Sequence, residues 1–229
     1  MKTIREYSDR NLQAQALSSD VVTQLQMVLK TKERATLAVP GGSTPVAFLQ
    51  ALSKQTLEWH RVDVLLTDER FVPESSPRSN TRLLRENLLI NNACTANLLP
   101  FYLPGDEPED ILDELADTVA PYLPADVCVL GMGTDMHTAS LFPGADRLDE
   151  ALDLNSSLLL LPLRAPGAFE SRITLTAPVL RASRFLHLLI CGTEKWHALE
   201  TALQEHDWRV APVKAVLDLS NSILIHYAN

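Results

Sequence analysis

Apolar residues recur along the chain in two patterns, one typical of amphipathic helices and the other of buried strands. Leucines and valines at helical spacing predict a helix over residues 11–30, and similar patterns predict helices at 46–52, 79–89, 108–119 and 193–203. Short continuous apolar runs predict buried strands at 36–39, 62–66, 126–130, 185–191 and 223–227, with further candidates at 98–102, 157–161 and 172–176.

The order of these segments, with strands and helices in alternation, predicts the fold class. It is an α/β protein with a doubly wound, mostly parallel sheet and helices on both faces, a Rossmann-like arrangement. The 229 residues can bury one full-sized core, and no repeat, low-complexity tract or linker divides them. We therefore expect a single domain over residues 1–229.

Composition narrows the classes of function. The formal net charge of −9 disfavours nucleic acid as a partner, and no apolar stretch is long enough to cross a membrane. The first residues lack the apolar core of a secretory signal, and the three cysteines, at positions 94, 128 and 191, form an odd and widely spaced set. Both features favour the reducing environment of the cytoplasm. An acidic protein that binds an anion also needs a local positive site, so basic residues near glycine turns are informative.

Four motifs begin where predicted strands end, after Val39, Leu66, Leu130 and Cys191. Ligands of parallel α/β sheets bind beyond the carboxyl ends of the strands, so the four motifs are expected to form one site. The first motif, Pro40-Gly41-Gly42-Ser43-Thr44-Pro45, offers backbone N–H groups, two hydroxyls and a helix N-terminus. These groups suit a phosphate, although an ordinary turn, with Pro45 as the first helical residue and Ser43 or Thr44 as its cap, explains them equally well.

The motif after Leu130 contains the best candidates for acid–base chemistry. Gly131 and Gly133 open the backbone, and Asp135 and His137 follow two residues apart. An unperturbed imidazole is available in its neutral form at cellular pH, so His137 can act as a general base with Asp135 as its orienting carboxylate. A structural or simply exposed histidine is the plainer interpretation.

Charged residues near three further strands are weaker candidates. Asp68 and Arg70 can supply a carboxylate and a guanidinium to a polar substrate, or form a solvated ion pair. Arg172 begins a predicted strand. Lys195 lies in the first turn of a predicted helix, where it opposes the helix dipole unless an anion offsets the charge. The chain lacks the His-Glu-x-x-His, Cys-x-x-Cys and Gly-x-Ser-x-Gly patterns, so neither a metal ion nor a serine nucleophile is indicated.

Together, these stretches resemble the 6-phosphogluconolactonase family over most of the chain. The resemblance rests on motifs in the family's order: Pro40–Pro45, Asp68–Pro73 with Ser79-Asn80, Gly131-x-Gly-x-Asp135-x-His137-Thr-Ala-Ser-Leu-Phe-Pro-Gly144, Arg172–Thr176 and Gly192-x-Glu-Lys195. The third motif is specific, and the others are individually weaker. The family is similar in fold to glucosamine-6-phosphate deaminases and ribose-5-phosphate isomerases, in agreement with the predicted sheet.

The resemblance implies a reaction and a set of roles. The reaction is hydrolysis of 6-phospho-D-glucono-1,5-lactone to 6-phospho-D-gluconate in the pentose phosphate pathway, with no metal or organic cofactor. His137 is implied as the general base and Asp135 as its partner. Asp68 and Arg70 are implied to line the site, with Arg70 a candidate to meet the oxyanion. The implied phosphate ligands are Gly41, Gly42, Ser43, Thr44, Arg172 and Lys195.

Three positions depart from the family pattern, and two rival functions remain open. Met136 replaces a common glycine, Arg181 replaces a common asparagine, and Ile223–Asn229 replaces the usual Trp-Leu ending.

Deaminases of this fold carry an acid five positions after the histidine, where this chain has Phe142, which disfavours the isomerase class. The second rival is a non-enzymatic sugar-phosphate sensor or an inactive paralogue. We expect the partner to be a small phosphorylated lactone, and the chain to be a monomer or small homo-oligomer.

Overall fold

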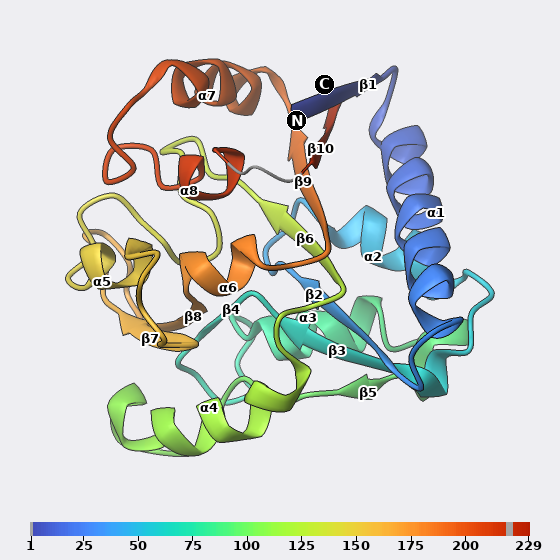
Figure 1. Ribbon diagram of the computed structural model, residues 1–229, viewed down its shortest axis with the longest axis horizontal. Coiled ribbons are helices and arrows are strands. Elements are labelled where there is room, and N and C mark those ends of the chain that lie inside the picture. The colour runs from blue at the N-terminus through green and yellow to red at the C-terminus, as the bar shows by residue number, and fades with distance from the viewer. Residues whose placement is uncertain (1, 219–221) are drawn as a thin grey trace.

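The computed structural model describes residues 2–218 and 222–229, and its central element is a seven-stranded parallel sheet (Figure 1). Every neighbouring pair of strands in it is parallel. The order is β1 (Lys2–Tyr7), β10 (Ile223–Ala228), β9 (Phe185–Cys191), β6 (Val127–Gly131), β2 (Ala35–Val39), β3 (Val62–Leu66) and β5 (Asn97–Leu98). The predicted class, an α/β protein with a mostly parallel sheet, is confirmed.

Helices cover both faces of this sheet. Figure 1 shows α1 and α2 on one side and α6, α7 and α8 on the other. The helices are α1 (Arg10–Leu29), α2 (Val46–Ser53), α3 (Asn80–Asn87), α4 (Leu112–Val119), α5 (Leu148–Leu152), α6 (Ala177–Arg181), α7 (Thr193–Gln204) and α8 (Lys214–Leu217). All five residues of β2 and of β3 are buried, as continuous apolar runs predict for strands covered on both faces.

A second, antiparallel sheet of three strands was not predicted. It has the order β4 (Asp68–Arg70), β8 (Arg172–Leu175) and β7 (Leu160–Leu163). The sequence indicated strands near β7 and β8, but β4 is too short and too polar to give an apolar pattern. The register pairs Arg70 with Arg172 and Asp68 with Thr174, so this sheet aligns residues predicted for the site.

One strand was not predicted, and the cap of one helix was predicted wrongly. The edge strand β1 was missed because five of its six residues are exposed, which leaves no apolar run to detect. Neither Ser43 nor Thr44 is the cap of α2, because Pro45 occupies the N-cap position, and in the described part of the chain this helix start has no side-chain cap hydrogen bond. The Thr44 hydroxyl instead accepts a hydrogen bond from Lys195. Smaller shifts concern the strand candidate at 98–102, which is β5 at 97–98, and the one at 157–161, which is β7 at 160–163.

Two buried histidines, His187 on β9 and His226 on β10, belong to a chain of hydrogen bonds that runs from Gln24 on α1 to Tyr7 on β1. The Gln24 side-chain oxygen is 2.8 Å from His187 Nε2, and His187 Nδ1 is 3.1 Å from His226 Nε2. His226 Nδ1 is 2.9 Å from the Tyr7 hydroxyl. Burial disfavours the charged form of both rings, and because a carboxamide oxygen only accepts, the neutral rings each donate through Nε2 and accept at Nδ1. His187 is a core residue, with 1% of its surface exposed.

Acidification from pH 7 to pH 5 is expected to destabilise the protein through these imidazoles. Burial lowers the pKa of His187 to about 4 and that of His226 to about 3. An unfolded histidine titrates near pH ~6.5, so below that pH the unfolded chain takes up protons that the native chain does not. Stability is therefore complete above about pH 6.5 and falls toward pH 4, by up to ~1.4 kcal/mol per pH unit for each ring.

Denaturant unfolding at pH 7, 6 and 5 measures this loss. The double variant His187→Gln/His226→Gln is expected to lose less stability over the interval than the wild type, whereas His60→Gln, at an exposed position, keeps the wild-type slope. An equally steep fall in the double variant would show that the buried pair is not responsible.

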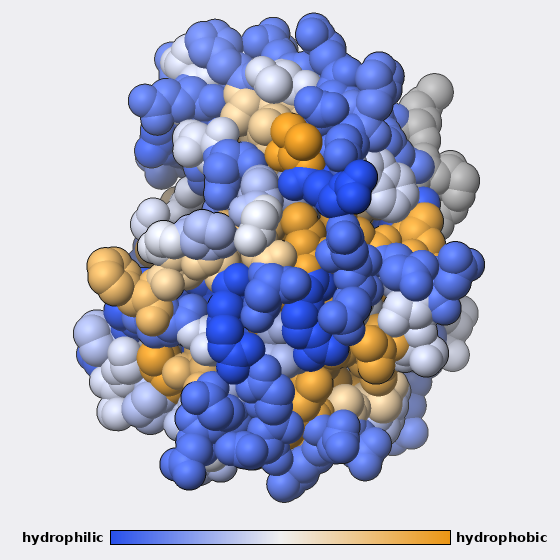
Figure 2. All heavy atoms as spheres, turned by 90° about the vertical axis from the view of Figure 1, so that its left-hand side faces the viewer, coloured by the Kyte–Doolittle hydropathy of each residue, from blue (hydrophilic) through white to orange (hydrophobic). Residues whose placement is uncertain are grey.

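The outer surface on the side of α6, α7 and α8 is mainly hydrophilic. Figure 2 shows blue residues over most of this side of the molecule, interrupted by apolar patches. The helix α7 accounts for part of this pattern, since it turns Ala198, Leu199 and Ala202 inward. In the described ranges, no helix combines the length and the hydropathy needed to span a bilayer.

Candidate active site

The four strands that precede the predicted motifs are direct neighbours, in the order β9-β6-β2-β3. Because they are parallel, their carboxyl ends meet at one edge of the sheet, where a cavity of about 230 Å³ opens. All predicted site residues except Asp135 line it: Gly41, Gly42, Ser43, Thr44, Asp68, Arg70, His137, Arg172 and Lys195. The fold therefore brings together residues that lie up to 154 positions apart in the sequence (Gly41 to Lys195, 195 − 41).

The glycine turn after β2 is shaped by close contact with Asn80. A Cβ atom on Gly41 would lie 2.0 Å from the Asn80 side-chain oxygen, so only glycine fits against that carboxamide. The Asn80 amide nitrogen donates to the Asp68 carbonyl at 2.9 Å, which fixes the orientation of the carboxamide. Gly42 has a φ of 87°, in the left-handed region that favours glycine. Asn80 occurs in the sequence only as part of a motif, and this contact gives it a structural role.

The loop after β6 holds the imidazole and its carboxylate in contact. His137 Nδ1 lies 2.5 Å from Asp135 Oδ1. A carboxylate only accepts, so Nδ1 carries the proton and Nε2 keeps the free lone pair that a base requires. Partial burial acts to raise the pKa of Asp135, but the hydrogen bond to His137, the attraction to its ring and the backbone hydrogen bonds together outweigh it and hold that pKa below its usual value.

The backbone of this loop is tight. Gly133 N–H donates to the His137 carbonyl at 3.0 Å, and Met136 N–H donates to the Gly133 carbonyl at 3.1 Å. Met136, which stands where the family commonly has glycine, adopts a φ of 65°. The side chain therefore does not prevent the left-handed conformation, although that conformation costs about 1 kcal/mol in a residue other than glycine. The Met136 carbonyl accepts from Val213 N–H at 3.0 Å, which helps to hold it.

Gly133→Ala is expected to slow by about 10²-fold any reaction in which the His137 imidazole acts as a base. A displacement of about 1 Å of a catalytic group has effects of that order. The added Cβ would lie 2.3 Å from both the Asp135 carboxylate and the His137 ring. Both side chains are partly exposed and can move aside, so the melting temperature should change little. Steady-state kinetics test this against Thr134→Ala, a change at the neighbouring exposed residue. Equal kinetics in the two variants would contradict the tight packing of the imidazole.

The β4 motif divides into residues that enter the cavity and one that does not. Asp68 is buried, and its Oδ2 accepts from the Ser140 hydroxyl at 2.6 Å and lies 3.8 Å from Arg172. Glu69 points away from the cavity and accepts from the backbone N–H groups of Asn80 and Thr81, both at 2.7 Å, so it anchors the start of α3. Although these hydrogen bonds oppose it, burial raises the pKa of Glu69.

Three residues that line the cavity have a buried side-chain atom with no hydrogen-bond partner among the residues that the structure describes. These atoms are Arg70 Nε, Arg172 Nε and Asn80 Oδ1. Burial also lowers the pKa of Arg172, although Asp68 acts in the opposite direction. Buried polar groups are normally hydrogen-bonded, so these three atoms are exceptions among the residues that line the cavity.

Lys195 reaches the same cavity from the first turn of α7. Its Nζ donates to the Thr44 hydroxyl at 3.1 Å. Burial lowers the pKa of Lys195, and the nearby Arg10 guanidinium acts in the same direction. Two cations close together in an acidic protein form a local positive site, of which Arg10 was not predicted to be a part.

The arrangement can perform acid–base chemistry on a bound anion. The cavity is lined by a base that has a free lone pair when its ring is neutral. It is also lined by side chains that supply ammonium, guanidinium and hydroxyl groups. In the described part of the chain, no group of three or more histidine, cysteine, aspartate or glutamate side chains is placed to hold a metal ion.

Comparisons with known proteins identify relatives over almost the whole chain. The family model described as glucosamine-6-phosphate isomerases/6-phosphogluconolactonase matches residues 8–225. A 6-phosphogluconolactonase of Pseudomonas aeruginosa is 44% identical over 207 residues, which cover 90% of this chain and 87% of the relative. A 6-phosphogluconolactonase of Rhizobium meliloti is 41% identical over 215 residues, or 93% of each chain.

A solved structure agrees with these matches. The crystal structure of a 6-phosphogluconolactonase from Shewanella baltica superposes with a TM-score of 0.96 at 32% identity, covering 100% of this chain and 98% of that one. The family is the one that the motifs of the sequence indicated. This chain therefore belongs to the glucosamine-6-phosphate isomerase/6-phosphogluconolactonase family.

Proposed function

We propose that this protein hydrolyses 6-phospho-D-glucono-1,5-lactone to 6-phospho-D-gluconate, as a 6-phosphogluconolactonase of the cytoplasmic oxidative pentose phosphate pathway. The observation that carries the proposal is the single cavity that His137, paired with Asp135, shares with Lys195, Arg172 and the glycine turn. The relatives that bear this name cover about nine-tenths of the chain.

The proposed reaction begins with the substrate held by its phosphate. The Gly41–Thr44 turn, Arg172 and Lys195 are the proposed phosphate ligands. His137 Nε2 then takes a proton from a water molecule, whose oxygen attacks C1 of the lactone. Asp135 accepts the hydrogen bond of the imidazolium that forms, and Asp68 helps to hold Arg172 in place.

The intermediate carries a negative charge on the former carbonyl oxygen, and Arg70 is the proposed partner of that charge. When the intermediate collapses, the bond between C1 and the ring oxygen breaks. The imidazolium returns its proton to the departing ring oxygen, so the base is regenerated and the product is the open-chain acid. Neither step requires a metal or an organic cofactor.

The alternative of a deaminase-like isomerase is disfavoured by Phe142, which stands where an acid would be needed and cannot transfer a proton. An inactive binding protein would keep the anion site but lose the chemistry of His137. The isomerase alternative predicts a different product, and the inactive alternative predicts no product.

An assay of the purified protein with two substrates tests the proposal. We expect acid release from 6-phosphoglucono-1,5-lactone well above the spontaneous rate, and no ammonia from glucosamine 6-phosphate. Ammonia release would favour the isomerase class, and lactone binding without turnover would favour an inactive paralogue.

A further inference from the structure

The aromatic ring of Phe142 contacts both the base and a cation of the cavity. Its centroid lies 4.0 Å from that of the His137 ring, with 31° between the planes. The Arg172 guanidinium carbon lies 5.0 Å from the same centroid. One uncharged side chain therefore lies against the group proposed to gain a proton and against a group proposed to bind phosphate.

The backbone on both sides of Phe142 is fixed. On one side, Ala139 has a φ of 47°, and Ser140 N–H donates to the Thr174 hydroxyl at 3.2 Å, which ties the turn to β8. On the other side, the Phe142 carbonyl accepts from Ala145 N–H at 3.1 Å. The ring is half-buried and packs against the core, so it has little freedom to leave the imidazole.

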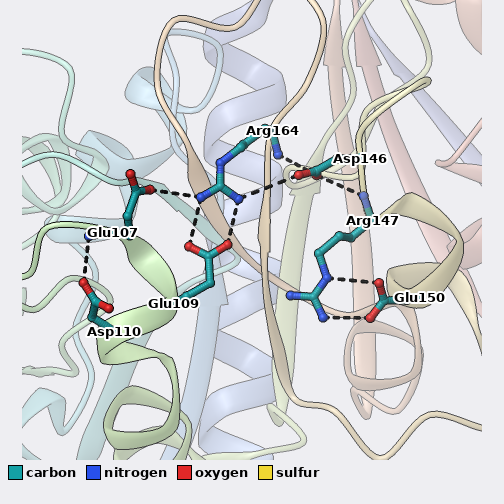
Figure 3. Close-up of polar contacts among 7 residues, drawn as sticks. All are labelled: Glu107, Glu109, Asp110, Asp146, Arg147, Glu150 and Arg164. Atoms are coloured by element: carbon teal, nitrogen blue, oxygen red, sulfur yellow. Dashed lines mark hydrogen bonds and ion pairs between the residues drawn. The ribbon is translucent and has the colours of Figure 1, made fainter.

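The segment that follows Phe142 is also held by an ionic network. Asp146 N–H donates to the Arg164 carbonyl at 3.0 Å, and Arg164 N–H donates to the Asp146 carboxylate at 2.8 Å. The Arg164 guanidinium bonds both oxygens of Glu109, at 2.7 and 2.9 Å, and also reaches Glu107 (Figure 3). This bidentate geometry restrains the chain beyond Phe142 more than an isolated surface pair would.

We propose that Phe142 is a positioning residue of the lactonase site, where its ring face stabilises the imidazolium form of His137 and holds the Arg172 guanidinium. An aromatic face attracts a cation within about 6 Å of its centroid, and both groups lie within that range. The catalytic part of this inference rests on the proposed function.

A purely space-filling role makes a different prediction. A leucine fills much of the same volume but has no aromatic quadrupole, so it would leave the protonation of His137 unchanged if Phe142 only packs. The other charged groups that line the cavity or bond to the imidazole are the same in such a variant: Asp135 on its own loop, Asp68 and Arg70 on β4, Arg172 on β8 and Lys195 on α7.

Kinetics as a function of pH separate the two roles. In Phe142→Leu we expect kcat to fall about 2- to 5-fold and the acid limb of kcat/KM to move about half a pH unit lower, because the imidazolium loses its aromatic partner. Phe142→Tyr, which keeps the ring, is expected to restore both. Phe169→Leu makes the same chemical change at a 93% exposed residue and should behave as wild type.

A second readout needs no turnover. The titration midpoint of His137 in the substrate-free protein, followed by NMR with His137→Ala used to assign the signal, should move by the same amount in Phe142→Leu. Phe142→Met serves in the same way if the leucine variant does not fold. An unchanged midpoint, or equal shifts in the tyrosine and leucine variants, would overturn this inference. A shifted midpoint in a protein that does not hydrolyse the lactone would support it and remove the proposed function.

Discussion

His137→Ala is expected to lower kcat for lactone hydrolysis by about 10²–10⁴-fold, the usual contribution of a positioned general base. The reason is geometric. Asp135 Oδ1 lies 2.5 Å from Nδ1 and accepts its proton in a hydrogen bond, so in the neutral ring the lone pair of Nε2 is available for the attacking water. Since the proposed phosphate ligands are not changed by the substitution, KM should stay within a few-fold of the wild-type value.

Two further variants make this result specific. Asp135→Asn keeps the size of the side chain but can present its amide to Nδ1, which disturbs the orientation of the ring, so we expect an intermediate loss of kcat. His197→Ala changes an exposed histidine on α7 outside the cavity and should have no effect. A His137→Ala variant that retains more than about a tenth of the wild-type kcat would contradict the proposed role of the imidazole.

Lys195→Ala is expected to raise KM for the phosphorylated lactone about 10- to 100-fold with little change in kcat. The ammonium is partly desolvated and bonded to Thr44, and a hydrogen bond to a charged group is typically worth about 1.5–3 kcal/mol. Because the phosphate lies far from the reacting carbon, its loss should weaken binding more than chemistry.

Steady-state kinetics with the lactone measure the split between the two constants. Lys54→Ala removes an exposed lysine just beyond the end of α2, so it controls for the change in net charge. Unchanged KM and kcat in Lys195→Ala would remove this residue from the phosphate site, and a fall confined to kcat would place it at the reacting carbon instead.

The sequence predicted the framework of the site because the framework is encoded locally. The strand at 62–66 and the strand at 185–191 were predicted with the bounds that the structure shows, since buried parallel strands are mostly apolar, here with only Asp63 and His187 as polar residues. The rule that ligands bind at carboxyl strand ends then placed the four motifs together, and the order β9-β6-β2-β3 makes them neighbours. The family and its fold followed from the motifs themselves.

What the sequence did not predict depends on contacts between distant residues. The short strand β4 exists because β8, about a hundred residues later, pairs with it, and this pairing sets Arg70 opposite Arg172. The fit of Gly41 against Asn80 and the contact of Phe142 with Arg172 arise in the same way. The left-handed backbone of Met136 also runs against local preference. It is held by the hydrogen bond that Met136 N–H donates to the Gly133 carbonyl and by the one that its own carbonyl accepts from Val213 N–H. The roles assigned to the site residues stay predictions until they are measured.

A crystal structure with bound 6-phospho-D-gluconate tests the central claim most directly. The account predicts the phosphate of this product between Thr44 and Lys195, within hydrogen-bond distance of the glycine turn, and the carboxylate at the other end beside His137 Nε2. A product bound in the reverse direction, or outside the cavity that these residues share, would contradict it.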